Sequence, residues 1–175
     1  MKKPIVISIS VFLFITNIIF IGTTVLYKTK IDKQVFKVYS FGGEGNDVRI
    51  NDGLVIISPN KQMVSGGTIQ YIGNKQERIQ SYSETIYLDK QVDKEIVLSN
   101  ASSFSGDTKG ITFRDEFLLN KGVGEISSEK LFSEDDINTI KDNLYFSLDY
   151  STVDGHKGNL TIKLKVKEFN MNQTK

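Results

Sequence analysis

Hydrophobic and polar residues follow two different patterns along this chain. From Ile5 to Tyr27 the residues are uncharged and almost all apolar, and a helix needs about 20 such residues to cross the hydrocarbon core of a bilayer. From residue 34 onward, short apolar runs, many of them alternating with polar residues, are separated by Gly, Asn and Asp. That second pattern is typical of β-strands and their turns. The sequence therefore predicts one membrane-spanning helix followed by a mainly β domain.

Eight strands are predicted in the β domain. Their expected ranges are 35–41, 48–58, 67–72, 78–88, 92–99, 110–119, 144–151 and 159–167. In one interpretation the second strand is interrupted at 51–53, because Asn-Asp-Gly favours a turn. Seven or eight short strands at this spacing predict a β-sandwich that is Ig-like in its general architecture.

One short helix is predicted to interrupt the strands. Ser133 is a suitable N-cap for the segment EDDINTIKDNL, whose first turn carries three acidic residues, 134–136, as the helix dipole favours. Phe132 and Ile137 have the spacing of a hydrophobic staple. A calcium site is the alternative for the acidic residues, but the ligand spacing of a hand-type loop is absent. We expect a connecting helix that lies on a sheet.

The last two strands are predicted to form a hairpin that turns at 154–155. In the final strand apolar and basic residues alternate strictly, so the apolar ones face inward and the basic ones outward. The inward residues are Ile162, Leu164 and Val166, and the outward residues are Lys163, Lys165 and Lys167. These lysines are a candidate surface for an anionic polymer or lipid headgroups. The favoured alternative is a solvated strand edge that lysines protect from aggregation.

The two patterns predict a domain organisation and a location. We expect a cytoplasmic N-terminus at 1–4, an anchor at 5–27, a charged stem at 28–33, the sandwich at 34–168 and a flexible tail at 169–175. A cleaved signal peptide is disfavoured because the apolar run is long and 22–25 is a poor cleavage site. Lysines flank both ends of the helix, so the positive-inside rule is nearly balanced. The short basic start favours a single-pass cell-membrane protein with an extracellular C-terminal domain.

Composition excludes several function classes. The chain has 22 Lys+Arg and 21 Asp+Glu residues, a formal net charge of +1, so no overall field attracts a nucleic acid and none is expected as a partner. Cysteine is absent, which excludes disulfides, zinc-thiolate sites and thiol nucleophiles. The cellular compartment is not decided by that absence.

The glycine-rich stretch FGGEGND at 41–47 invites comparison with a phosphate-binding loop. Such a loop leads into a helix and usually carries Lys followed by Ser or Thr. Here the glycines are followed by NDVRI, a turn and then a strand. We therefore expect a tight bend in which the glycines adopt positive φ, and no nucleotide cofactor.

No catalytic, cofactor-binding or metal-ligating residue is assigned from the sequence. His156, the only histidine, falls in the predicted hairpin turn, where a catalytic triad has no rigid support. Acidic residues cluster in two predicted connections and offer calcium ligands or, more simply, solvated side chains. The first cluster is Asp89, Asp93 and Glu95, and the second is Asp149 and Asp154.

A serine-rich stretch, 99–105, is predicted to be a loop that contains Phe104. An exposed aromatic side chain on such a loop is a candidate recognition residue, whereas a buried one packs on the core. We therefore include Phe104 with the three lysines 163, 165 and 167 in the predicted recognition surface.

Three stretches, YSFGGEGNDVRI, GGTIQYIGNK and NLTIKLKV, resemble small envelope proteins of Gram-positive bacteria that join a lipoprotein signal or single anchor to a β-sandwich-like domain. The residues that match are Ser40, Phe41, Gly43, Glu44, Gly67, Tyr71, Gly73 and Asn74. The chain departs from that group because it has no tryptophan and no lipobox cysteine. The resemblance implies the fold and an envelope location, and no activity.

These observations predict a non-catalytic, membrane-anchored module that binds or supports another component of the bacterial envelope. An envelope hydrolase that works with loop carboxylates is one alternative. The other is an accessory or sensor protein that modulates a membrane partner through its helix, where Asn17 offers hydrogen bonds between helices.

Overall fold

A computed structural model of the chain describes residues 3–32, 36–90, 92–104, 110–117 and 120–169. The chain divides after Val35 into two units. The first contains the helix α1, Lys3–Asp32, and its segment Ile7–Lys28 is long and apolar enough to cross a membrane. The predicted helix is confirmed, and it continues through 28–32, where the stem was expected.

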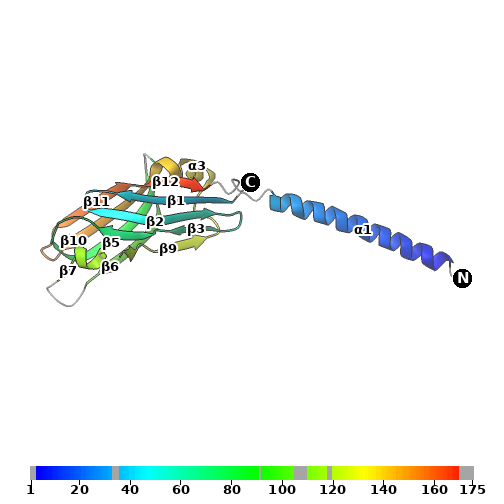
Figure 1. Cartoon of the computed structure of the whole chain (residues 1–175), viewed down its shortest axis with the longest axis horizontal. Coiled ribbons are helices and arrows are strands. Elements are labelled where there is room, and N and C mark those ends of the chain that lie inside the picture. The colour runs from blue at the N-terminus through cyan, green and yellow to red at the C-terminus, as the bar shows by residue number, and fades with distance from the viewer. Residues whose placement is uncertain (1–2, 33–35, 91, 105–109, 118–119, 170–175) are drawn as a thin grey trace. The chain divides into compact units, whose positions relative to one another are not determined.

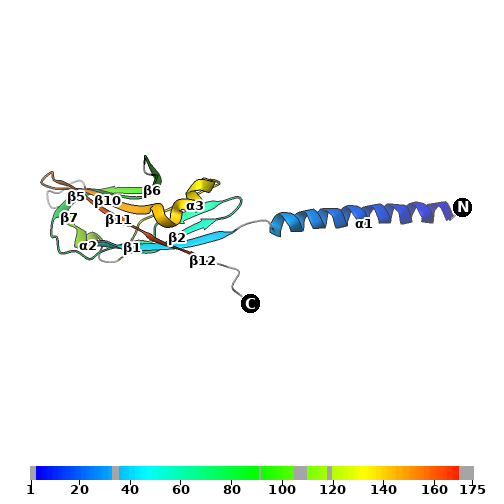
Figure 2. The same ribbon diagram turned by 90° about the horizontal axis from the view of Figure 1, so that it is seen from above.

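The second unit is a sandwich of two antiparallel sheets, labelled in Figure 1 and seen as two layers in Figure 2. The first sheet has the order β12-β1-β2-β3-β9, with β4 on β2 and β8 on β4. Its strands are β1 (Lys37–Glu44), β2 (Val48–Ile57), β3 (Gln62–Ser65), β4 (Thr68–Tyr71), β8 (Lys121–Gly122), β9 (Glu125–Ser128) and β12 (Lys165–Phe169). The predicted β-sandwich is confirmed.

The second sheet has the order β11-β10-β5-β6, and β7 pairs with β5. Its strands are β5 (Arg78–Asp89), β6 (Lys94–Ser103), β7 (Ile111–Thr112), β10 (Leu144–Thr152) and β11 (Lys157–Lys163). Two short helices, α2 (Phe113–Phe117) and α3 (Glu134–Asn143), lie in the connections. All strand pairs of both sheets that are described are antiparallel.

The core lies between the sheets and is built from alternate residues of each strand. On β10, for example, Leu144, Phe146 and Leu148 are fully buried, as predicted. Burial of one such side chain stabilises the fold by about 1.5–3 kcal/mol relative to its exposure. The largest fully buried aromatic side chains are Tyr39, Phe113, Phe117, Phe132 and Phe146.

The predicted final strand, 159–167, is divided between the two sheets. β11 pairs with β10, whereas β12 pairs with β1, and the chain changes sheets at Leu164. Ile162 and Leu164 are buried and the lysines beside them are exposed, so the predicted alternation is confirmed. Alternation has the same period on both sides of the junction, which is why it did not reveal the change of sheet.

The predicted strand 110–119 is wrong over most of its length. Of the described residues 110–117, only Ile111–Thr112 form a strand, and α2 follows it immediately, while 118–119 lie outside the described residues. The Thr112 hydroxyl accepts a hydrogen bond from the Asp115 backbone N–H at 3.2 Å, which caps the first turn. Phe113 and Phe117 are both fully buried, because residues four apart share one face of a helix.

Three smaller predictions are also corrected. β3 and β9 were not anticipated, and 99–103 belongs to β6 instead of a loop. β2 runs without a break through 51–53, although Asp52 has a φ of 57°. The Gly53 position has no room for a side chain, since a Cβ there would lie 2.1 Å from the Phe41 ring.

The glycine-rich stretch forms a hairpin turn, but not in the way expected. β1 continues to Glu44, and Gly45 N–H donates to the Val48 carbonyl at 2.9 Å to close the turn. Neither Gly42 nor Gly43 has positive φ. A Cβ at Gly42 would lie 2.9 Å from the Ile50 carbonyl oxygen, so close backbone approach is the reason for glycine there.

The predicted helix at 134–143 is confirmed together with its cap. Ser133 and Asp136 form a capping box, in which the Ser133 hydroxyl accepts from the Asp136 N–H and the Asp136 carboxylate accepts from the Ser133 N–H. Phe132 is buried, as is Ile140. The Asp136 carboxylate also contacts Lys90 at 2.6 Å. This carboxylate therefore takes part in both the helix cap and an ion pair.

Candidate functional site

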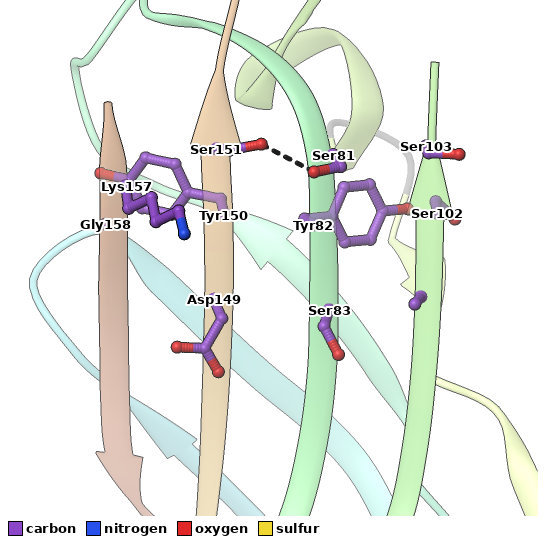
Figure 3. A pocket seen from close by; sticks show the side chains of 11 residues that line it. Ser81, Tyr82, Ser83, Ser102, Ser103, Asp149, Tyr150, Ser151, Lys157 and Gly158 are labelled. Carbon is purple, nitrogen blue, oxygen red and sulfur yellow. Dashed lines mark hydrogen bonds between the residues drawn. The ribbon is translucent and has the colours of Figure 1, made fainter. Parts of the chain in front are cut away.

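An open hollow on the sandwich lies on the outer side of the second sheet (Figure 3). It is an open depression of about 500 Å³. Most of the residues that line it are small, apart from Tyr82, Tyr150 and Lys157, and they come from all four strands of the β11-β10-β5-β6 path. We define the hydroxyl face as the outward residues Ser81, Ser83, Ala101, Ser103, Ser147, Asp149, Ser151, Lys157, Asn159 and Thr161.

Strand register places eight of these residues in two rows across the sheet, and Ser147 and Thr161 pair in a third row. One row is Ser103, Ser81, Ser151 and Lys157, and the next is Ala101, Ser83, Asp149 and Asn159. Between the rows, Tyr82 on β5 is buried in the core, whereas Ser102 on β6 and Tyr150 on β10 are half-buried. Short side chains in adjacent rows leave space above the sheet, and this space is the hollow.

Asp149 is the centre of a hydrogen-bonded network on this face. Its Oδ1 accepts from Asn159 Nδ2 at 2.7 Å, and its Oδ2 accepts from the Ser147 hydroxyl at 3.0 Å. The Thr161 hydroxyl donates to the other end of the Asn159 amide at 2.9 Å. The network holds the carboxylate and the amide in fixed directions while Asp149 stays exposed.

A second polar contact crosses the sheet one row away. The Ser81 and Ser151 hydroxyls lie 2.7 Å apart and point toward one another from β5 and β10 (Figure 3). Each hydroxyl keeps further donor or acceptor capacity. The hollow therefore presents several fixed hydrogen-bonding groups and a single carboxylate.

The face ends at a pair of stacked aromatic rings. Tyr87 and Tyr145 lie opposite each other on β5 and β10, with ring centroids 5.7 Å apart and an angle of 16° between planes. Lys94 lies over the Tyr87 ring at 4.6 Å and Lys163 over the Tyr145 ring at 5.9 Å. These cation–π contacts hold the two lysine side chains at this end of the face.

Among the described residues, the groups considered for catalysis do not gather on the hydroxyl face. Asp149 has no second carboxylate on the hydroxyl face. His156 lies exposed in the β10–β11 turn, where its backbone N–H donates to the Thr152 hydroxyl at 3.1 Å. Within the described ranges, no three His, Asp or Glu side chains gather to hold a metal ion.

The structure separates the predicted recognition residues. Lys163 and Lys165 border a second hollow of about 430 Å³ with Arg49 and Asp52. Lys167 lies farther along β12, opposite Ser40. Phe104 is not near them; it follows β6 and packs on the core, with its ring centroid 6.0 Å from that of Tyr82.

The loop carboxylates considered as calcium ligands are used elsewhere. Lys90 pairs with both Glu95 and Asp136. Asp93 accepts a hydrogen bond from the Lys94 N–H at 2.8 Å within its own turn. In the second cluster Asp149 belongs to the hydroxyl face and Asp154 lies in the exposed hairpin turn.

Sequence reasoning missed a buried carboxyl group, that of Glu84 in the middle of β5. Glu84 is 0% exposed, and neither carboxyl oxygen has a hydrogen-bond partner in the described part of the chain. Burial raises its pKa to about 7, with Lys121 acting in the opposite direction. The signal was present, because Glu84 alternates in phase with the inward residues Tyr82 and Ile86.

Three more charged or polar side chains lie near Glu84 at the edge of the core. The Tyr82 hydroxyl donates to Glu116 Oε1 at 2.6 Å, and Lys121 contacts both of these groups. Burial is also the first reason that the pKa of Tyr82 is raised. Lys121 neutralises the negative charge of Glu116. The charges of this cluster therefore cancel when Glu84 is left out.

The serine positions of the hydroxyl face were likewise not singled out from the sequence. The signal in the sequence is a serine, threonine or asparagine at alternate outward positions of four strands. These positions can be recognised as one surface only when the strand order is known. Comparison with protein-family models, curated proteins and solved structures finds no match to this chain.

Proposed function

We propose that this chain is a single-pass membrane protein whose β-sandwich stands on the outer side of a bacterial cell membrane and binds a hydroxyl-rich polymer of the envelope without chemically changing it. The observation that carries the proposal is the fixed Asp149–Asn159–Ser147 network, whose Asp149 carboxylate borders the open hollow. The Asp149 carboxylate offers acceptors to sugar hydroxyls, and the paired Ser81 and Ser151 hydroxyls beside it in the hollow add donor capacity. Little reorganisation is then needed on binding.

The proposal has a membrane part that is supported by the apolar segment Ile7–Lys28 and by the short basic N-terminus. It can be tested because the chain has no cysteine. Asn60→Cys places a single thiol at an exposed position outside the hydroxyl face. Labelling by a membrane-impermeant maleimide in intact cells is expected, whereas labelling only after lysis contradicts an external sandwich.

The binding part is tested with the full chain in detergent micelles and purified, insoluble envelope glycan. We expect co-sedimentation, and we expect the double variant Asp149→Ala, Asn159→Ala to bind roughly tenfold more weakly, since each lost hydrogen bond contributes about 0.5–1.5 kcal/mol. The control is Lys165→Ala, Lys167→Ala on the other sheet. If the lysine variant loses binding and the first does not, the anionic-polymer interpretation replaces this one.

A further inference from the structure

β6 forms one edge of the second sheet in the part of the chain that the structure describes. Of the described strands only β5 pairs with it. From Ile96 to Ser103 the strand contains no charged residue and no proline. Ile96 is 64% exposed, and Ser99, Asn100, Ala101 and Ser103 are exposed as well.

The other edges of the sandwich are protected by charged side chains or by short length, whereas β6 carries charges only at its start, on Lys94 and Glu95. β12 carries Lys165, Lys167 and Glu168, and β11 has Lys157 and Lys163 at its ends. β9 is four residues long and starts with Glu125. Short length and charged side chains are the usual means by which proteins keep an edge from pairing with another strand. A long neutral edge is therefore available for pairing.

The free backbone groups of this edge can be identified. Phe104 N–H donates to the Gln80 carbonyl at 2.8 Å, so residues 104 and 80 are a hydrogen-bonded pair of the antiparallel ladder. Hydrogen-bonded pairs alternate along such a ladder. Ser99, Ala101 and Ser103 consequently direct their N–H and C=O groups away from β5. The pairing is regular from Leu98 to Ser103, so these groups lie in one row.

We propose that this edge pairs with the same edge of a second copy of the chain, antiparallel and centred on Ala101. In that register Ala101 faces Ala101, and Ser99 of each copy faces Ser103 of the other. Each facing residue has free groups on the correct side, and every side chain in the pairing is small and uncharged. Self-pairing thus satisfies the open groups and places no like charges together.

The pairing has a consequence for the candidate site. Ala101, Ser102 and Ser103 line the hollow on the second sheet, and Figure 3 labels Ser102 and Ser103 on β6. A second copy continues the sheet past this edge with its own Ala101 and Ser103. The two hydroxyl faces then form one continuous surface, to which each copy contributes residues beside the other's hollow.

The second copy is favoured over a strand from another protein by the symmetry of the edge itself. An antiparallel two-fold pair requires that each residue tolerate its own facing partner, and the neutral, small residues 99–103 meet this condition. On the proposed function, copies also share one membrane, which raises their effective concentration.

The first experiment uses Ala101→Cys in the full chain in membranes, under mild oxidation. Facing residues of a hydrogen-bonded pair lie about 5.5 Å apart, within reach of a disulfide. We expect a cross-linked dimer. Ser99→Cys and Lys167→Cys are the controls and are expected to stay monomeric, because Ser99 is two positions from the axis and Lys167 lies on the other sheet. Equal cross-linking at all three positions, or none at Ala101→Cys, overturns the proposal.

The second experiment measures dimerisation of the cysteine-free chain in detergent micelles by analytical ultracentrifugation. Ala101→Lys places two like charges opposite each other and is expected to weaken the dimer at least tenfold, whereas Ala101→Thr is expected to keep it. A monomeric wild-type chain, or a dimer unaffected by Ala101→Lys, overturns the proposal. No glycan is present in either experiment, so failure here and failure of glycan binding are separate results.

Discussion

Lys90 Nζ lies 2.6 Å from the buried Oδ1 of Asp136, which joins the turn after β5 to the first turn of α3. The same carboxylate accepts hydrogen bonds from the Ser133 N–H at 2.8 Å and the Ser133 hydroxyl at 2.6 Å. Lys90 and the capping residue Ser133 thus both contact the Asp136 carboxylate. The helix start is fixed from two directions.

This relationship predicts an acid-sensitive step in stability. Burial alone raises the pKa of Asp136, but the hydrogen bonds from Lys90 and Ser133 lower it below its ordinary value of 3.8. The folded state therefore favours the charged carboxylate, and the stabilisation present above pH 3.8 is lost as the pH falls through the lower folded-state pKa. Asp136→Asn is expected to flatten this acid limb in urea denaturation curves measured between pH 2 and 7.

Ser133→Ala separates the cap from the ion pair. Removing an N-cap hydroxyl costs about 1 kcal/mol of unfolding free energy, and the Lys90 contact remains. Thr139→Ala, on the exposed side of the same helix, is the matched control and is expected to change stability by less than about 0.5 kcal/mol. Equal losses in both variants would contradict the capping role.

Glu84 predicts the opposite pH dependence. Its folded-state pKa is raised to about 7 by burial, so the folded state favours the neutral acid. Its contribution is complete below the unfolded pKa near 4.5, and it is lost as the pH rises toward 7, with a total change of about 3 kcal/mol. Glu84→Gln is expected to remove this decline and to make the protein more stable than wild type at pH 8.

The measurement for Glu84 is denaturation at several pH values, followed by tyrosine fluorescence in the full chain. Glu77→Gln is the control, because Glu77 is exposed just before β5 and its variant should keep the wild-type profile. A Glu84→Gln curve parallel to wild type from pH 4.5 to 8 would show that the buried acid does not titrate in this interval.

Gly67 is expected to be intolerant of any side chain. Its φ is +72°, and a Cβ would lie 2.1 Å from the Asn51 carbonyl oxygen. Gly67→Ala therefore combines backbone strain of about 1–3 kcal/mol with a backbone clash. At Gly122 in β8 nothing lies within 4 Å of an added Cβ, so Gly122→Ala is the control. Thermal unfolding should separate the two variants clearly, and similar melting temperatures would contradict the geometry.

Asn17 is expected not to control association of α1. Its Nδ2 donates to the Leu13 carbonyl of its own helix at 2.8 Å, so the amide already has a partner without a second helix. Asn17→Leu should leave membrane insertion and the Ala101→Cys cross-link unchanged. Loss of the cross-link in this variant would favour the alternative in which the helix itself binds a membrane partner.

The spacing of apolar residues along the sequence was sufficient to predict some elements and misleading for others. The hairpin of β10 and β11 and the capped helix α3 were predictable because their signals are local: strict alternation, a turn, and a serine before acidic residues. Phe113 and Phe117 were misread because a short segment of five residues carries too few turns to distinguish a helical from a strand period.

The candidate site was less predictable than the fold. Lys163, Lys165 and Lys167 form one row in the sequence, but the change of sheet at Leu164 places Lys163 on β11 and the other two on β12. Ser81 and Ser151 are 70 positions apart and meet only through the pairing of β5 with β10. The alternation of residues along β5 could have shown that Glu84 points inward. Its lack of a hydrogen-bond partner could not be predicted from the sequence.

The crossing of the chain at Leu164 also bears on mechanical strength. β1, the first strand after α1, is held on one side by β2 and on the other by β12, and β12 is covalently continuous with the opposite sheet through Leu164. A pull along β1 loads both ladders in shear, and the backbone at Leu164 passes part of that load to β11 and β10. Force that reaches the sandwich from its N-terminal side is therefore shared by both layers.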